Sequence, residues 1–123
     1  MNSYYETLVS VCLSDSPVLR VWVDDDFDYR DPGPGWVWFF TSAEALSFFA
    51  WCQQENITVD RVSLDHDLGG DDTTRPIVTW WVENDWWPAV VTVHSANGVG
   101  VDWLEGTVER YHPSNAHKYA HRR

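Results

Sequence analysis

The stretch Val18–Asp26, VLRVWVDDD, passes from apolar to acidic at one point in the chain. The part up to Val23 is short, rich in β-branched residues and preceded by Pro17, which indicates a buried strand. The same change recurs at Arg61–Leu64 (RVSL), a second short apolar run that is followed directly by Asp65–Asp67, DHD. Two predicted strands therefore each deliver acidic side chains at their carboxyl ends.

Helices are predicted between the strands. Thr41 and Glu44 have the spacing of a capping box, in which a hydroxyl and a carboxylate satisfy free N–H groups at a helix start. This helix is predicted to end near Asn56. Asp72–Thr74 is expected to cap a second helix, whose first turn tolerates Pro76. The remaining predicted elements are strands at Trp36–Phe40 and Ala89–Val93 and a last helix at Val101–Tyr111, after a break at Gly98 and Gly100.

Strands that alternate with helices imply parallel βαβ units and an α/β layer fold. Right-handed crossovers put the carboxyl ends of the strands at one edge of the sheet, where open α/β sheets bind ligands. The polar residues that directly follow predicted strands are expected to converge there; they are Asp24–Asp26, Thr41–Ser42, Asp65–Asp67 and His94–Asn97. The domain is expected to span residues 18–112, with residues 1–17 as an N-terminal arm and residues 113–123 as a basic tail.

The 123 residues hold 8 Lys and Arg against 19 Asp and Glu, which gives a formal net charge of −11. Long nucleic acid is not expected as a partner, because its binding depends on Lys and Arg that displace counterions. No apolar run approaches the roughly 20 residues of a membrane helix. The two cysteines, Cys12 and Cys52, do not form a disulfide framework. These features predict a cytoplasmic protein without a membrane segment.

Asp24, Asp25 and Asp65 are the candidate metal ligands. Two carboxylates about 5 Å apart repel by roughly 3 kcal/mol at an effective dielectric constant of about 20. A group of three therefore needs a cation, shared protons or exposure to water. Carboxylate oxygens suit Mg²⁺ or Mn²⁺, and the sequence predicts one of these ions here. The alternative is that the three residues are solvated loop or capping residues.

His66 and His94 each follow a predicted strand directly. Imidazoles titrate near neutral pH, so the pair is a candidate general acid and base. The alternatives are a turn residue or metal ligand for His66 and a backbone hydrogen bond for His94. Ser95 is a candidate donor to a phosphate oxygen, with an ordinary turn or helix cap as its alternative.

Nine tryptophans are more than a chain of this length needs. Trp22, Trp80 and Trp81 fit core positions of a predicted strand and helix. The others that the sequence singles out either cover the core, stack on a base or form a protein interface. These are Trp36, Trp38, Trp86, Trp87 and Trp103.

Three blocks, Val23–Asp25, Ser63–Gly69 (SLDHDLG) and Val93–Asn97 (VHSAN), are similar in this order to the cyclic-phosphate-processing receiver-like family of bacteria and phages. The similarity covers roughly Val18–Tyr111. It implies a small receiver-like (flavodoxin-like) three-layer fold with a mainly parallel four-stranded sheet and no clear fifth strand. By motif position it also implies a site made of Asp24, Asp25, Asp65, His66, Asp67, His94 and Ser95.

The receiver domains of response regulators are similar too, but they place a Lys after a fifth strand, and the only Lys here is Lys118, in the tail. The predicted function is therefore metal-dependent processing of a small cyclic phosphate or a nucleotide phosphate end, rather than a phosphorylation switch. A second hypothesis rests on the charge. In that hypothesis the chain is a non-catalytic acidic binding protein, a decoy of the kind that phages encode, which blocks a basic surface of a host protein.

Overall fold

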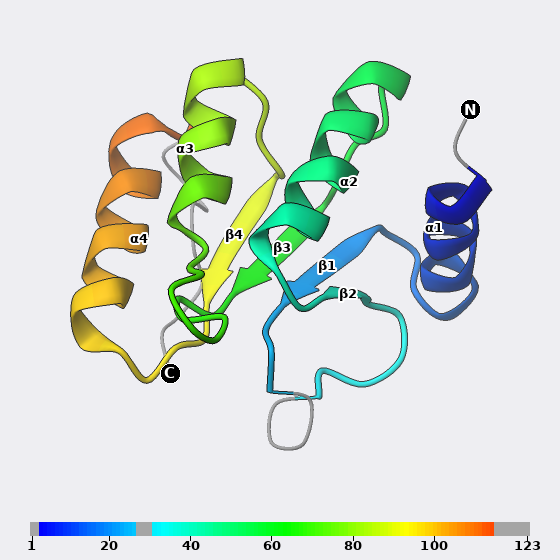
Figure 1. The fold of residues 1–123 in the computed structure, drawn as a ribbon. Coiled ribbons are helices and arrows are strands. Elements are labelled where there is room, and N and C mark those ends of the chain that lie inside the picture. Colours follow the sequence, from blue (N-terminus) through cyan, green and yellow to red (C-terminus); the bar gives the residue numbers. More distant parts are fainter. Residues whose placement is uncertain (1–2, 27–30, 115–123) are drawn as a thin grey trace.

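The computed structural model describes residues 3–26 and 31–114. Within these residues the centre is a sheet of four strands, in which every neighbouring pair is parallel. The strands are β1 (Arg20–Val23), β2 (Val37–Phe39), β3 (Arg61–Leu64) and β4 (Val90–Val93), in the spatial order β2-β1-β3-β4. The helices are α1 (Ser3–Asp15), α2 (Ser42–Glu55), α3 (Arg75–Asn84) and α4 (Gly98–Tyr111). The predicted parallel α/β sheet is confirmed, and the carboxyl ends of its strands meet at one edge (Figure 1).

Helices α2, α3 and α4 lie side by side on one face of the sheet (Figure 1). Alternate strand residues point into this interface and are at most 1% exposed; they are Val21, Val23, Val62, Leu64, Val91 and Val93. The family resemblance implies helices on both faces of the sheet. In the described residues, helices cover only this face. The described connection from β1 to β2 holds Pro32, Gly33, Pro34 and Gly35, and such residues disfavour a helix.

The N-terminal segment forms a helix that packs on the domain. α1 contacts β2 at the edge of the sheet. Its Cys12 is 1% exposed and donates its thiol hydrogen to the Gly35 carbonyl, with the sulfur 2.9 Å from the oxygen. The ring of Tyr5 meets those of Phe48 and Trp51 on α2. α1 is therefore part of the same hydrophobic cluster as the sheet.

The predicted capping box of α2 is confirmed. The Thr41 hydroxyl accepts from the Glu44 N–H, and the Glu44 carboxylate accepts from the Thr41 N–H, both at 3.2 Å. The predicted end is confirmed as well, because Asn56 adopts the left-handed conformation with φ 57°. Asp72, from the loop after β3, accepts hydrogen bonds from the Ser42 N–H at 2.9 Å and the Ser42 hydroxyl at 2.5 Å. Asp72 thus caps α2, while Thr74, within the predicted capping segment 72–74, is the N-cap of α3 and Pro76 lies in the first turn as predicted.

The predicted start of α4 is wrong. The helix begins at Gly98, and Gly100 lies inside it instead of breaking the chain. Asn97 makes this early start possible, because its side-chain oxygen accepts from the Gly100 N–H at 3.0 Å. Gly100 is needed for packing, since a Cβ there would lie 2.3 Å from Cγ of His66.

The tryptophans are mostly half-buried. Trp81, on α3, is fully buried, as predicted, while Trp22 and Trp80 keep part of their surface exposed. None of the helices in the described ranges is long and apolar enough to cross a membrane. The predicted basic tail lies outside the described residues from residue 115 onward, as do residues 27–30 of the acidic loop.

Candidate functional site

Three carboxylates meet at the carboxyl edge of the sheet. Asp24 follows β1 and Asp65 follows β3, and these strands are neighbours. One oxygen from each of Asp24, Asp25 and Asp65 lies within 4.8 Å of the other two. Asp24 is 0% exposed and Asp65 is 7% exposed, whereas Asp25 is open to solvent. The structure therefore brings the predicted metal ligands together, with two of them largely removed from water.

The Asp24 carboxylate is held from two sides. One oxygen accepts from the Asp26 N–H at 2.8 Å, and the other lies 3.0 Å from Nε2 of His94. The backbone carbonyl of Asp24 also accepts from the indole N–H of Trp38 at 2.7 Å. These contacts fix both the side chain and the backbone at the end of β1.

His94 is 4% exposed, and both of its ring nitrogens have partners. Nε2 faces Asp24, and Nδ1 lies 2.7 Å from the Ser63 hydroxyl on β3. Because an ionised carboxylate only accepts, the Nε2–H of His94 donates to Asp24. The ring of Trp22 stacks on the imidazole, with centroids 3.8 Å apart and planes 10° from parallel. His94 thus joins the ends of β4 and β1 across the intervening β3.

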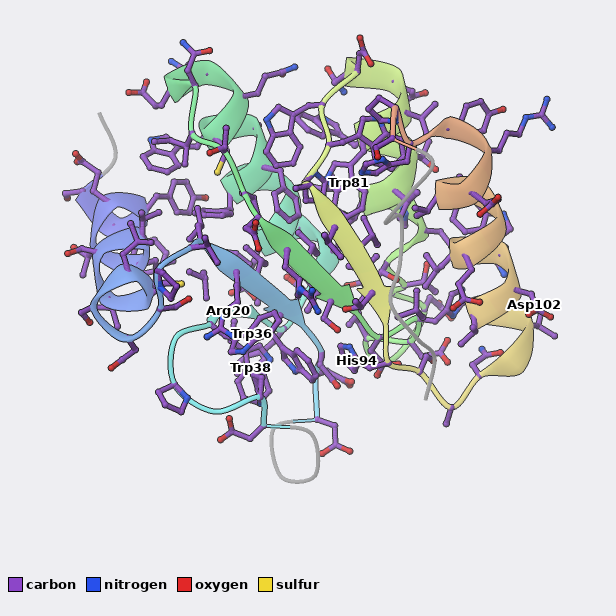
Figure 2. All side chains as sticks on the ribbon, turned by 180° about the vertical axis from the view of Figure 1, so that it is seen from behind. Arg20, Trp36, Trp38, Trp81, His94 and Asp102 are labelled. Atoms are coloured by element: carbon purple, nitrogen blue, oxygen red, sulfur yellow. The ribbon has the colours of Figure 1, made fainter. Side chains whose placement is uncertain are left out.

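Aromatic residues gather beside this pair on the sheet face away from α2, α3 and α4. Figure 2 shows Trp36, Trp38 and Arg20 together beside β1 and β2, with His94 at the carboxyl end of β4. The Arg20 guanidinium lies over the Trp36 ring, 4.7 Å from its centroid. Trp36 meets Trp22 edge to face at 5.4 Å. These tryptophans therefore cover the sheet next to Asp24, which accounts for part of the tryptophan surplus.

His66 belongs to a second cluster at the same edge. Its ring is 5% exposed, with Nδ1 2.9 Å from the Asp67 carboxylate and Nε2 accepting from Nε of Arg75 at 2.8 Å. Because a guanidinium only donates hydrogen bonds, Nε2 carries no proton and Nδ1–H donates to Asp67. His66 is therefore a neutral imidazole whose tautomer is set by its two neighbours.

Asn97 connects this cluster to α4. Its side-chain NH₂ donates to Asp67 at 3.0 Å, while its oxygen caps the helix at Gly100. Hydrogen bonds from Asn97 and then from His66 hold the pKa of the Asp67 carboxyl below its ordinary value of 3.8. Asp67 is therefore an ionised acceptor, although 58% of its side chain is exposed.

Ser95 lies in the turn before α4 and is 3% exposed. Its hydroxyl oxygen accepts from the Asn97 N–H at 3.2 Å. The structure thus supports the turn that the sequence left as an alternative. The hydroxyl hydrogen makes no bond to another residue in the described ranges.

Sequence reasoning missed two members of these clusters. Ser63 is a polar residue between the apolar Val62 and Leu64 of β3, and that exception was the available signal. Arg75 is the first residue of α3, where the helix dipole disfavours positive charge. A basic residue at the start of a helix was therefore the second available signal of a functional role.

The parallel sheet, the order β2-β1-β3-β4 and the carboxylates at its carboxyl edge define an α/β domain of the receiver type. A family model described as Cyclic-phosphate processing Receiver domain matches residues 19–110. The chain belongs to this family. The match begins just before β1 and ends within α4, so α1 lies outside it. A search of curated proteins found no match.

Proposed function

We propose that the chain binds a divalent cation at Asp24, Asp25 and Asp65 and opens a small cyclic phosphate ester at that site. One observation carries the proposal: three carboxylates from the ends of two neighbouring strands place oxygens within 4.8 Å of one another. The family description, which names cyclic-phosphate processing, supports the substrate class.

The residues present fit Mg²⁺ or Mn²⁺. All three side chains offer hard oxygen donors, and none of them is a thiolate or an imidazole, which would favour zinc. Asp24 and Asp65 are buried, so their mutual repulsion is only weakly screened by water. A bound ion would offset this repulsion, neutralise phosphate charge and lower the pKa of a bound water.

The imidazoles act as positioning groups in this proposal. His94 donates to Asp24 and holds its carboxylate in one orientation. His66 holds Asp67 through Nδ1–H, and its Nε2 is occupied by Arg75. Every ring nitrogen of the two imidazoles has a protein partner, which suits these positioning roles. The proton transfer that the sequence predicts for the pair stays a prediction beside them. The Ser95 hydroxyl keeps its hydrogen available for a phosphate oxygen.

The substrate is expected to be small. With 19 acidic against 8 basic residues, the protein repels a long polyanion, whereas a single cyclic phosphate carries little charge. Hydrolysis adds water to phosphorus and breaks one P–O bond of the ring, so the product is an open phosphate monoester.

The test combines metal binding with product detection. Mn²⁺ is titrated into labelled protein, and broadening of the amide signals near Asp24 and Asp65 is followed by NMR. A panel of nucleoside 2′,3′- and 3′,5′-cyclic phosphates is then incubated with Mg²⁺, and ³¹P NMR monitors a new monoester signal. We expect local broadening and opening of at least one ester.

Asp65→Asn and Asp71→Asn form a matched pair, since each removes one charge and only Asp65 belongs to the carboxylate group. Activity and broadening should disappear in Asp65→Asn and persist in Asp71→Asn. The proposal is wrong if no ester is opened and Mn²⁺ broadens no signal at the strand ends of the folded wild-type protein.

A further inference from the structure

Arg75 is held rigidly by two different contacts. Its Nε donates to His66 at 2.8 Å. Its guanidinium carbon lies 4.9 Å from the centroid of the Trp103 ring on α4. The His66 imidazole fixes one edge of the guanidinium, and the Trp103 indole covers one of its two faces. The side chain therefore occupies one orientation between α3 and α4.

The two terminal nitrogens of Arg75 remain without acceptors. Within residues 3–26 and 31–114, neither Nη donates a hydrogen bond, and no carboxylate lies within ion-pair distance of the guanidinium. This is notable in a chain with 19 acidic residues. The Asp67 carboxylate contributes only a longer-range attraction, because its oxygens are taken by Asn97 and His66.

The position of Arg75 adds to its positive potential. It is the first residue of α3, at the end where the helix dipole places partial positive charge. The other described arginines lie elsewhere: Arg20 and Arg61 begin strands at the opposite edge, and Arg110 lies in the last turn of α4. Among the arginines of the described residues, Arg75 is the one at the carboxyl edge of the sheet, where Asp24, Asp25 and Asp65 also lie.

We propose that Arg75 is the phosphate-binding residue of this site, with its two Nη groups donating to phosphoryl oxygens of the ligand. The chemical class of the ligand, a phosphate ester, rests on the proposed function. The choice of Arg75 as the residue that binds it rests on the contacts described above. A planar guanidinium matches two phosphoryl oxygens at once. His66 and Trp103 preorganise it, so little side-chain freedom is lost when the anion binds.

The first measurement needs no variant. Inorganic phosphate is titrated into ¹⁵N-labelled protein with and without Mg²⁺, and the Nε–H signal of Arg75 is followed by NMR. We expect a saturable shift of this signal. The Nε–H signal of Arg110, which lies over Tyr111 at the other end of α4, should stay unchanged.

Variants then separate binding from structure. Arg75→Gln should weaken phosphate binding about tenfold or more, because both Nη donors and the charge are lost. Arg75→Lys keeps the positive charge but loses the paired Nη donors, so its affinity for phosphate should fall between those of the wild type and Arg75→Gln. Arg110→Gln, which removes the same charge from the same protein, should bind phosphate as the wild type does. Mn²⁺ broadening near Asp65 should persist in all three variants.

The outcomes distinguish this inference from the proposed function. Equal phosphate affinity in Arg75→Gln and wild type overturns the assignment and leaves Arg75 as a support for His66. Mn²⁺ binding without any phosphate binding overturns it as well, while the metal site stands. If phosphate shifts Arg75 and the affinity falls in Arg75→Gln, the assignment holds even where Mn²⁺ fails to bind at Asp65.

Discussion

His94 reaches across β3 to Asp24, so that Nε2 of an imidazole after β4 lies 3.0 Å from a carboxylate after β1. Both side chains are almost fully buried. His94→Ala removes the Nε2–H donor and leaves the buried Asp24 carboxylate without this hydrogen bond. We expect a loss of about 3 kcal/mol in the free energy of unfolding, measured by urea denaturation in EDTA.

The double variant Asp24→Ala, His94→Ala is the control for this pair. Once the carboxylate is gone, removal of the imidazole should cost much less, so the double loss should fall short of the sum of the single losses by about 1 kcal/mol or more. Strict additivity would show that the two groups do not interact in solution.

Gly100 is the point at which α4 meets His66. A Cβ there would lie 2.3 Å from the ring, so Gly100→Ala must displace His66 or the helix. We expect a destabilisation of about 1–3 kcal/mol by thermal or urea unfolding. Gly106→Ala lies in the same helix with open space around its Cβ position. That control should instead stabilise the protein by roughly 0.5–1 kcal/mol. A neutral Gly100→Ala would contradict the packing.

Asp72 links the loop after β3 to the start of α2. Asp72→Ala leaves the Ser42 N–H without its acceptor, and the expected cost is about 1 kcal/mol, as for other helix caps. Asp71→Ala removes a neighbouring exposed carboxylate and should change the free energy of unfolding by less than about 0.5 kcal/mol. Equal effects of the two changes on urea unfolding would disprove the cap.

Cys52 is a buried thiol on α2, and burial raises its pKa to about 12. At pH 8 the folded protein therefore holds Cys52 as the thiol, whereas the thiolate is the form that reacts with iodoacetamide. We expect no alkylation of Cys52 in the folded protein and rapid alkylation in guanidinium chloride, as read by mass spectrometry of the peptide. Fast reaction of Cys52 in the folded state would contradict this placement.

The same shift predicts a dependence of stability on pH. A raised pKa means that the folded protein holds the thiol proton more tightly than the unfolded chain does. The Cys52 contribution is therefore complete below the ordinary pKa of 9.0 and declines as the pH rises towards about 12. Urea unfolding at pH 8 and 10 measures the decline, and Cys52→Ala should show a smaller difference between the two pH values.

Local features of the fold were predictable. The strand β3, the capping box of Thr41 and the end of α2 at Asn56 agree with the structure. The start of α4 was not predictable from propensity, because Gly98 and Gly100 disfavour a helix. The Asn97 cap allows the helix to begin there, and the contact with His66 explains Gly100 alone. The segment 72–74 was correctly predicted to cap α3 through Thr74, but the bond of Asp72 to α2 was not predictable because its partner, Ser42, lies 30 residues away in the sequence.

The sequence by itself determined the order of strands and helices and the convergence of carboxylates at one edge. Those properties follow from interactions within a few residues and from the handedness of parallel crossovers. Only the tertiary structure decided what the two histidines contact. The partners of His94 are 31 and 70 residues away, and they depend on β3 lying between β1 and β4. His66 meets Arg75 only nine residues further along the chain, but the packing of Gly100 and Trp103 against this pair depends on where α4 lies.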